Sequence, residues 1–477
     1  NGLTDDVVNA CGKCDEPCYE EHYDEPGNCG EPGRSCNGTE PDPTDPGSIT
    51  LGQVQASAPF IYISVTGRNQ VAKLDTVTGQ KMWQVNSYGT NPSRTAVAFD
   101  YSVWVGNRGF GNPNDPGQSN IVHLDLDGNF LCRGDVTGIA RGLAIDAYGN
   151  VWVGAYNTGI LYQFDGKLID AGQSPPRCKL LRSVSTGVNI YGLAIDGRGF
   201  VYTASHPNTA KVDVSNGSIV ATPANPSHYG VAVDKNNNVW FGGWSGGGNV
   251  HRMLGDNPYT VWNTSVNNVT AVTVHPDDGT IWGSSYGTNE VVKIDPQNGN
   301  ALCRHAVSNG TNPHGVAVDG AGKIWTPLRY GGYANRWTKD CQPDGSFPVD
   351  PGQELYTYSD MTGVQLRTIT TKEGHWVQDF DSGYASPVWY RAEWTATANP
   401  PDTGVEISFK AADTAGGLQS NPTATCGPFQ ANQSPADLTT CPFLSGHRWL
   451  EADVKLWTKK DGVRPKFSDL KIFWARP

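Results

Sequence analysis

The sequence predicts an all-β protein in which a seven-bladed β-propeller is followed by a β-sandwich of jelly-roll type and preceded by an irregular, cysteine-rich arm. Three observations support this prediction. A six-residue motif recurs through the middle of the chain, alternation of apolar and polar residues follows it, and the first 47 residues show neither pattern. We expect the arm over 1–47, the propeller over 48–350 and the sandwich over 351–477.

The recurring motif is clearest at Arg141-Gly-Leu-Ala-Ile-Asp146, and Trp152 follows its aspartate by six residues. Further copies begin at Thr95, Tyr191, Tyr229, Thr270 and His314. The aromatic anchors, including one from an orphan strand, are Tyr62, Trp104, Trp152, Tyr202, Trp240, Trp282 and Trp325, and their spacings lie between 38 and 50 residues. A period of this length with four strand-like pieces indicates a β-propeller, and seven anchors indicate seven blades.

Each repeat predicts four strands around a central tunnel. The motif forms the inner strand, whose small residues suit a crowded tunnel, and the aromatic anchor lies on the second strand between blades. The third strand ends in an aspartate and a glycine turn, as at Asp75, Asp125, Asp213 and Asp295. An aspartate at such a turn accepts hydrogen bonds from its own following backbone, so we expect these residues to form structural Asx turns.

The first blade lacks a clear inner strand. Either Leu51–Gln55 is a degraded copy, or a strand near Glu354–Ser359 returns to complete the ring. Closure by a strand from the far end of the chain removes the open edges that a sheet otherwise exposes. The sequence does not distinguish between these two ways of closing the ring.

The repeats resemble those of the virginiamycin B (streptogramin) lyase family and those of the YVTN-type propellers of surface-layer proteins. The stretch Ile61-Tyr-Ile-Ser-Val-Thr-Gly-Arg-Asn-Gln-Val-Ala-Lys-Leu-Asp-Thr-Val-Thr-Gly79 is the best match to the second group. The resemblance covers about 300 residues and implies the propeller fold.

The lyase resemblance implies a metal-binding carboxylate three residues after the aromatic anchor of the active blades, and a histidine base. The residues at that position are Val65, Asn107, Ala155, Ser205, Gly243, Ser285 and Leu328, and none is acidic. Pro313-His314-Gly315 retains the histidine, but a magnesium-assisted elimination lacks its ligands, so the lyase activity is not carried over. We expect no cofactor and no metal.

One stretch resembles a second enzyme class, the quinone-dependent dehydrogenases: Leu74-Asp-Thr-Val-Thr-Gly-Gln-Lys-Met-Trp83. That family repeats such a sequence in most blades, whereas it occurs once here. The resemblance therefore does not extend to the whole propeller.

Residues at the starts of the inner strands should gather around one mouth of the tunnel. These residues are Arg94, Arg141, Tyr191, His228, Tyr229 and His314. A ring of histidine, tyrosine and arginine suits an anionic or sugar ligand. The alternative is a set of solvated loop residues that cap the channel.

Eleven cysteines indicate disulfides in an oxidising compartment. Cys132 and Cys303 lie on the last strand of their repeats, and Cys178 and Cys341 lie at the corresponding place in the next repeat. This parallel spacing predicts two equivalent bridges between neighbouring blades. A third, local bridge is predicted between Cys426 and Cys441.

The arm carries 12 acidic residues against Lys13 and Arg34, so most of the net charge of −12 belongs to it. Such a segment cannot bury a core, and ordering its backbone costs about 1–2 kcal/mol per residue. We expect disulfides, in preference to zinc, among Cys11, Cys14, Cys18, Cys29 and Cys36. The arm should then lie against a neighbouring subunit or, alternatively, against its own propeller.

From about residue 365 the chain alternates apolar and polar residues in five stretches, which predicts the strands of a β-sandwich. The arrangement resembles jelly-roll modules appended to secreted bacterial proteins. Trp389, Trp394, Trp449 and Trp457 have the spacing of core residues, so we expect them in the core and not exposed for stacking on sugars.

The nearly neutral body gives no reason to expect a nucleic-acid partner, and no apolar run is long enough for membrane insertion. We expect an extracellular or cell-surface protein with a structural, adhesive or assembly role and no catalysis. Its partners would be other protein subunits, in a homo-oligomer, surface filament or coat, or a glycan. The alternative is a secreted lyase or hydrolase acting on a polysaccharide or cyclic peptide at the tunnel mouth.

Overall fold

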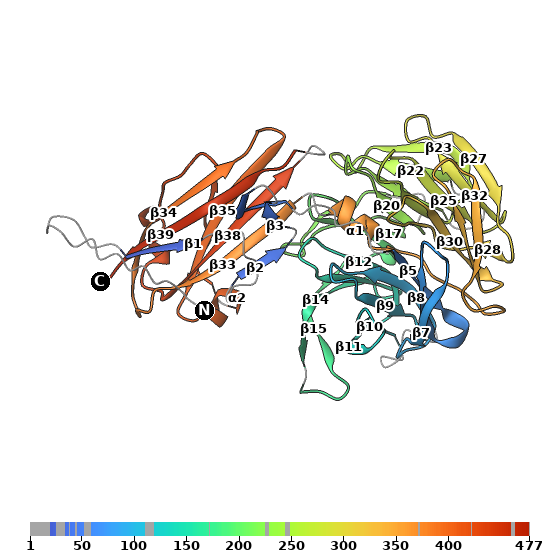
Figure 1. The fold of residues 1–477 in the computed structure, drawn as a ribbon, viewed down its shortest axis with the longest axis horizontal. Helices are drawn as coiled ribbons and strands as arrows, with labels where there is room; N and C mark the ends of the chain where they lie inside the picture. Colours follow the sequence, from blue (N-terminus) through green and yellow to red (C-terminus); the bar gives the residue numbers. More distant parts are fainter. Residues whose placement is uncertain are drawn as a thin grey trace. The chain divides into compact units, whose positions relative to one another are not determined.

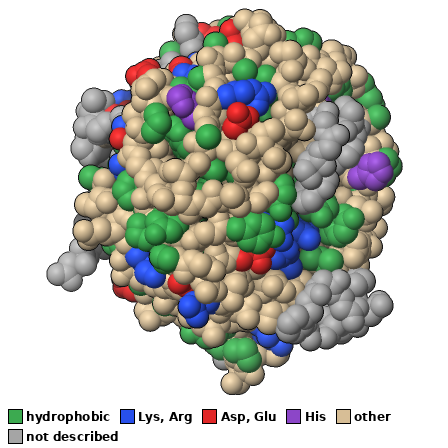
Figure 2. Space-filling view, turned by 90° about the vertical axis from the view of Figure 1, so that its right-hand side faces the viewer, with side chains coloured by type: hydrophobic (Ala, Val, Ile, Leu, Met, Phe, Trp, Pro, Cys, Tyr) green, Lys and Arg blue, Asp and Glu red, His purple; other side chains and the backbone are tan. Residues whose placement is uncertain are grey.

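The structure is a computed structural model that describes residues 20–24, 34–37, 39–42, 45–51, 59–109, 119–170, 172–224, 229–243, 249–370, 373–420, 422–458 and 463–476. Strands dominate it, which confirms the predicted all-β class (Figure 1). Among the described residues, no helix has the length and hydropathy of a membrane span. On the face drawn in Figure 2, basic and acidic side chains are both present and spread over the surface.

The chain divides into two compact units. The propeller unit is Val54–Thr370, and the second unit joins Asn1–Gln53 to Thr371–Pro477. This division differs from the boundaries expected from the sequence, because the arm belongs with the C-terminal strands and residues 351–370 belong with the propeller.

The described strands of the propeller unit fall into seven successive groups, with antiparallel neighbours inside each group. The groups are β5 (Phe60–Val65), β6 (Gln70–Asp75) and β7 (Lys81–Asn86); β8 (Pro92–Val97), β9 (Val103–Asn107), β10 (Asn120–Leu124) and β11 (Phe130–Asp135); β12 (Ile139–Ile145), β13 (Val151–Tyr156), β14 (Ile160–Asp170) and β15 (Arg177–Ser185); β16 (Asn189–Ile195), β17 (Phe200–His206), β18 (Lys211–Asp213) and β19 (Ile219–Ala221); β20 (Val231–Val233), β21 (Val239–Phe241), β22 (Asn249–Met253) and β23 (Val261–Asn267); β24 (Ala271–Val274), β25 (Ile281–Ser285), β26 (Glu290–Ile294) and β27 (Ala301–Ala306); and β28 (Thr311–Pro313), β29 (Ala317–Val318), β30 (Ile324–Tyr330), β31 (Tyr333–Trp337) and β32 (Pro343–Pro348).

The first group is completed by a segment from the far end of the unit. The amide of Tyr62 donates to the carbonyl of Met361 at 3.0 Å, and the amide of Gly67 donates to that of Glu354 at 3.2 Å. The segment between Glu354 and Met361 therefore takes the inner position of the first blade. Leu51, the described residue of the other predicted closure, lies on a strand of the second unit.

The aspartate at the end of an inner strand holds the aromatic anchor of the second strand. One oxygen of Asp146 accepts from the indole Nε1 of Trp152 at 2.8 Å and from the amide of Gln163 at 3.1 Å. The other oxygen accepts from the backbone amide of Asn150 at 2.9 Å. Burial raises the pKa of Asp146 to about 6, although these hydrogen bonds act in the opposite direction.

The same bond recurs where the motif is well formed. The indole of Trp240 donates to Asp234 at 2.9 Å, that of Trp325 donates to Asp319 at 2.7 Å, and the hydroxyl of Tyr202 donates to Asp196 at 3.4 Å. In the two weaker copies the indole Nε1 atoms of Trp104 and Trp282 are buried without a partner in the described structure. The hydrogen bond is thus present in the copies that match the sequence motif well and absent in the two that match it poorly.

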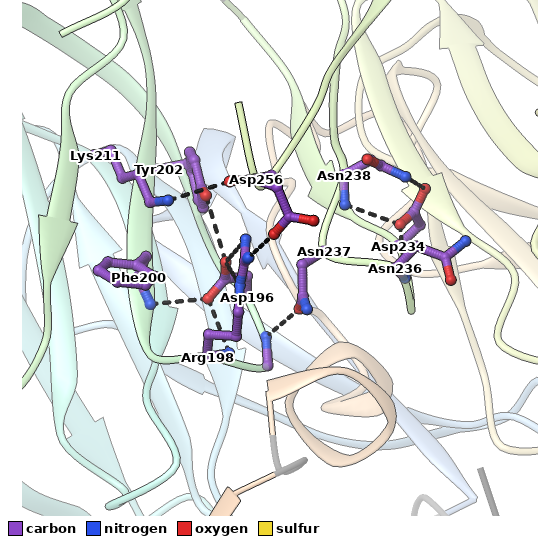
Figure 3. A network of polar contacts seen from close by, with 12 residues as sticks. Asp196, Arg198, Phe200, Tyr202, Lys211, Asp234, Asn236, Asn237, Asn238 and Asp256 are labelled. Carbon is purple, nitrogen blue, oxygen red and sulfur yellow. Dashed lines mark hydrogen bonds and ion pairs between the residues drawn. The ribbon is translucent and has the colours of Figure 1, made fainter. Parts of the chain in front are cut away.

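These turns also link neighbouring blades (Figure 3). Arg198 contacts the carboxylate of Asp196 at 3.2 Å and also pairs with Asp256, which lies between two strands of the next group. The backbone amide of Gly197 donates to the side chain of Asn237 at 2.9 Å. One turn therefore fixes its own anchor and the adjoining blade together.

The predicted Asx turns at the ends of the third strands are confirmed. Asp75 accepts from the backbone amides of Val77 at 2.8 Å and Thr78 at 2.7 Å. The equivalent bonds to the residue two positions later occur at Asp125, Asp213 and Asp295. These half-buried aspartates shape turns.

Small residues line the tunnel because the inner strands approach one another closely. A Cβ atom on Gly142 would lie 2.6 Å from Leu193, and one on Gly315 would lie 2.2 Å from the carbonyl oxygen of Thr357. Both distances are far below a van der Waals contact. Glycine is therefore required at these two positions, where an inner strand meets the next.

The three predicted disulfides, Cys132–Cys178, Cys303–Cys341 and Cys426–Cys441, are confirmed. The first lies where β11 and β15 pair in parallel, which joins two groups into one eight-stranded sheet. A bridge between outer strands opposes separation of neighbouring blades. Such bridges fit an oxidising compartment.

The second unit contains two sheets that enclose one core. The strands of the first are β1 (Glu20–Asp24), β3 (Thr39–Asp42), β4 (Asp45–Leu51), β34 (Val388–Thr397), β37 (Ala436–Asp437) and β39 (Lys466–Ala475), and those of the second are β2 (Arg34–Asn37), β33 (Glu373–Asp381), β35 (Thr403–Ala412), β36 (Cys426–Gln430) and β38 (Trp449–Thr458). Short helices are α1 (Val364–Thr368) in the propeller unit and α2 (Ala415–Ser420) here. As predicted, Trp389 and Trp394 lie in this core.

Two tryptophans predicted in the core lie outside it. Trp449 and Trp457 are half-buried, whereas Leu450 and Leu456, their neighbours on β38, belong to the core. Successive residues of a strand point to opposite faces, so the core takes the leucines and the tryptophans face away from it. The spacing alone did not distinguish the two faces.

The described arm strands add to the edges of their own C-terminal unit. β2 pairs with β33, and both β1 and β4 pair with β39. Ile49 and Leu51 are buried in the shared core. This corrects the expected docking on a neighbouring subunit or on the propeller: edge pairing uses backbone groups, so an acidic segment without apolar periodicity can still join a sheet. Cys11, Cys14, Cys18 and Cys29 lie outside the described residues, and only the backbone of Cys36 is described.

Replacing Asp146 by Asn should lower the free energy of unfolding of the propeller by about 1–3 kcal/mol, because an amide donor then faces the donors of Trp152 and Gln163. Urea unfolding measures the change. Asp75→Asn is the matched control and should cost less than about 0.5 kcal/mol, since asparagine also supports an Asx turn. Equal losses in the two variants would contradict the role assigned to the buried aspartate.

Removing the Cys132–Cys178 bridge by a double serine substitution should cost about 2–4 kcal/mol of unfolding free energy, since it closes a separation of 46 residues. Removing Cys303–Cys341, with a separation of 38, should cost nearly the same. Urea unfolding of both variants tests this pair. A loss confined to one bridge would show that the two are not equivalent.

Candidate functional site

Five of the residues predicted at the mouth come together where the inner strands begin. The hydroxyl of Tyr229 lies 2.7 Å from Nε2 of His314. Arg94 donates from Nη2 to the backbone carbonyl of Tyr191 at 3.1 Å. The guanidinium carbon of Arg141 lies 4.9 Å from the centre of the Tyr191 ring. The spatial grouping expected from the repeats is therefore present.

Local backbone irregularity directs two of these side chains. The pairing of β12 with β13 shifts register around Arg141, and that of β16 with β17 shifts at Tyr191. Each residue is thus the extra residue of a β-bulge, a feature that re-aims a side chain beside functional sites. His228, the sixth predicted residue, lies outside the described residues.

The segment that closes the first blade adds two tyrosines that the sequence analysis did not select. Arg141 donates from Nη1 to the hydroxyl of Tyr356 at 2.9 Å, and that hydroxyl also contacts the hydroxyl of Tyr229. The hydroxyl of Tyr358 donates to the carbonyl of Tyr191 at 2.7 Å. The sequence did contain a signal for these two tyrosines. The closing strand predicted near Glu354–Ser359 includes both of them, and an inner strand extends to the mouth.

A second missed group lies four residues after the aromatic anchors. Arg108 places its guanidinium carbon 4.1 Å from the ring centre of Tyr356, and Arg329 donates to the hydroxyl of Tyr286 at 3.1 Å. Residues i and i+4 of a strand share a face, whereas the position three after the anchor, which the lyase resemblance singles out, lies on the other. The position four residues after the anchor therefore identifies residues at the mouth, and the position three residues after it does not.

We call the assembled residues the mouth cluster: Arg94, Arg108, Arg141, Tyr191, Tyr229, Tyr286, His314, Arg329, Glu354, Tyr356 and Tyr358. The cluster contains four guanidinium groups and one carboxylate. That carboxylate, of Glu354, accepts a hydrogen bond from Arg329 at 2.8 Å. The other three arginines form no ion pair within the described part of the chain. The cluster therefore has an excess of positive charge.

This charge alters the acidity of the tyrosine at its centre. Burial acts to raise the pKa of Tyr356, but the guanidinium groups of Arg141, Arg94 and Arg108 outweigh it and lower that pKa. Burial lowers the pKa of Arg108 to about 10, which leaves it protonated at neutral pH. Burial and the nearby arginines lower the pKa of His314 well below its ordinary value, so the imidazole is neutral.

Three buried nitrogens of the cluster have no hydrogen-bond partner in the described structure. They are Nε of Arg94, Nε of Arg141 and Nδ1 of His314. A buried donor without a partner costs about 1–3 kcal/mol, so such atoms usually find an acceptor. Unpaired arginine donors beside uncompensated charge are features of a site that accepts anionic oxygens.

The opposite end of the tunnel is closed. Helix α1 lies there, and apolar residues such as Leu143, Leu193 and Val233 line a cavity of about 50 Å³ beside it. Since a water molecule needs about 10–15 Å³ of such space, this cavity accommodates a few water molecules. Of the two ends, the mouth is the candidate site.

One trio among the described residues has the spacing of metal ligands: Cys303, His305 and Cys341. The two sulfurs are bonded to each other, so they are not the thiolates that a metal requires. The trio therefore serves as a disulfide with a neighbouring histidine.

No family model matches this chain, and no curated protein matches it. Solved structures similar to it include virginiamycin B lyase from Staphylococcus aureus, at 14% identity and a TM-score of 0.43 over 54% of this chain and 84% of that one. A streptogramin B lyase structure is 13% identical, with a TM-score of 0.44 over 65% and 95% of the chains. A functionally unknown protein from Desulfotomaculum acetoxidans DSM 771 is 11% identical, with a TM-score of 0.48 over 63% and 100%. The lyases that the repeats resemble are thus among the similar structures. The lyase activity belongs to those named proteins.

One tyrosine should ionise below the ordinary tyrosine range, and Tyr356→Phe should remove that phase. The folded pKa of Tyr356 is lowered, so its ionisation stabilises the fold above the unfolded pKa of about 10, and this contribution is lost as pH falls through the folded value. Ultraviolet absorbance of tyrosinate follows the titration. Tyr358→Phe is the control and should keep the early phase, because burial raises the pKa of Tyr358. An early phase that survives Tyr356→Phe would contradict the assignment.

Proposed function

We propose that this chain is an extracellular adhesive protein that holds an anionic ligand at the propeller mouth and does not convert it chemically. The observation that carries the proposal is the set of three arginines, Arg94, Arg108 and Arg141, without a carboxylate partner among the described residues. Guanidinium groups bind carboxylate, sulfate and phosphate oxygens through charge-assisted hydrogen bonds.

The half-buried arginines are the ones that a ligand can reach. Arg108 and Arg141 are partly exposed, whereas Arg94 is fully buried beneath them. We therefore assign the direct contacts to Arg108 and Arg141, and we assign to Arg94 a long-range contribution to the positive potential.

The extracellular part of the proposal is supported by the three disulfides, which suit an oxidising compartment. Two kinds of partner fit an anion-binding mouth in such a setting. One is an acidic glycan. The other is an acidic segment of another protein subunit.

A binding role suits the cluster better than the rival role of a lyase or hydrolase. His314, the histidine retained from the lyase resemblance, is fully buried, and its Nε2 is engaged by Tyr229. Tyr356 has an acidified hydroxyl but is only 3% exposed. Both groups are buried and hold the mouth cluster together from beneath the arginines that we assign to the ligand.

Purified protein should bind at least one of three polyanions, polygalacturonate, dextran sulfate or polyglutamate, in isothermal titration calorimetry at low salt. The Arg108→Gln/Arg141→Gln variant should lose roughly tenfold or more in affinity, since each charge-assisted contact contributes about 1.5–3 kcal/mol. Arg391→Gln, on the second unit, is the matched control and should bind as the wild type does. A thermal melt of each variant separates lost binding from lost folding.

Glu354→Gln should strengthen the same binding, because it frees Arg329 from its carboxylate partner. An increase of about two- to tenfold in affinity is expected from one uncompensated charge near the surface. Failure of all three polyanions to bind would overturn the proposed function. Product release from any of them, abolished by His314→Ala in a protein that still folds, would favour the rival enzyme.

A further inference from the structure

The rim of the mouth carries aromatic side chains whose role the charge does not explain. Tyr156, Tyr191 and Tyr286 are half-buried, and Tyr330 is 47% exposed. The first two meet edge to face with ring centres 4.7 Å apart. Partly exposed tyrosines offer rigid apolar faces with a polar tip, which suits a ligand that has both apolar and polar surfaces.

Charge and ring are adjacent around this rim. The guanidinium carbon of Arg141 lies 4.9 Å from the Tyr191 ring centre, and that of Arg329 lies 5.2 Å from Tyr330 and 5.8 Å from Tyr286. An anionic group on the arginine would therefore place its attached carbon skeleton against a tyrosine face. A sugar ring with an acidic substituent has this combination within one residue.

The balance of donors and acceptors favours a sugar over a peptide. The mouth cluster offers many arginine donors, and its single carboxylate, Glu354, is already paired with Arg329. The backbone amides of a bound peptide would compete for few acceptors, whereas sugar hydroxyls can accept as well as donate.

The depth of the cluster favours a polymer that crosses the mouth. Arg94, Tyr229 and Tyr356 lie buried at its base, and helix α1 closes the far end of the tunnel. A ligand is therefore held at the rim, where contact with several tyrosines requires an extended molecule.

We infer that the ligand of the mouth is an acidic polysaccharide, with its acidic groups on Arg108 and Arg141 and its sugar rings against Tyr156, Tyr191, Tyr286 and Tyr330. This inference rests on the proposed anion-binding function. Carboxylated and sulfated sugars share the recognition chemistry, and the probes below separate them.

The test compares binding of polygalacturonate, dextran sulfate, neutral dextran and polyglutamate to the full chain by calorimetry. One of the two charged polysaccharides should bind at least about tenfold more tightly than dextran and polyglutamate, because only they engage arginines and rim together. Whichever of the two binds more tightly identifies the acidic group.

Tyr330→Ala should weaken the charged polysaccharide at least about threefold and leave polyglutamate binding unchanged, whereas Tyr330→Phe should retain the affinity because it keeps the ring. A thermal melt checks that both variants fold. If polyglutamate binds as tightly as the charged polysaccharides, or if Tyr330→Ala weakens all probes alike, the inference is overturned while the anion-binding function stands. If no polyanion binds, both fail.

Discussion

The hydrogen bond between the aspartate that ends an inner strand and the aromatic residue six positions later organises the propeller. It is made deep in the fold, where Asp146 and Trp152 are fully buried, and it fixes the turn between the first two strands of a blade. Because the partners are so close in sequence, the four repeats that have this bond can form it before they meet their neighbours. Packing of the indole between blades then extends a local constraint to the whole ring.

The mouth is a consequence of that constraint. Fixing the aspartate at one end of the inner strand and the anchor on the second strand determines which residues reach the other end. Arg141 and Tyr191 project there from bulges, Arg108 and Arg329 from the ends of second strands, and Tyr356 from the closing segment. The variable residues of a regular repeat thus meet at one place, as in other folds in which a rigid scaffold carries binding residues.

Sequence reasoning located what depends on local pattern. The repeats predicted the propeller and five clustered mouth residues, and parallel spacing predicted the blade-to-blade disulfides. It did not locate what depends on distant pairing: Tyr356 is brought to Arg141 across 215 positions, and the arm strands join sheets at the opposite end of the chain. Sequence reasoning also placed Trp449 and Trp457 wrongly. Period-two alternation shows that a strand has two different faces, but it does not say which face packs in the core.

The central claim is that arginines without a carboxylate partner among the described residues, beside a rim of tyrosines, form an anion site. The most direct test is a crystal structure of the full chain with a short oligomer of whichever charged polysaccharide binds more tightly. The account predicts carboxylate or sulfate oxygens within hydrogen-bond distance of Arg108 and Arg141 and a sugar ring against Tyr191 or Tyr286. An oligomer bound on the second unit with the mouth empty would contradict it.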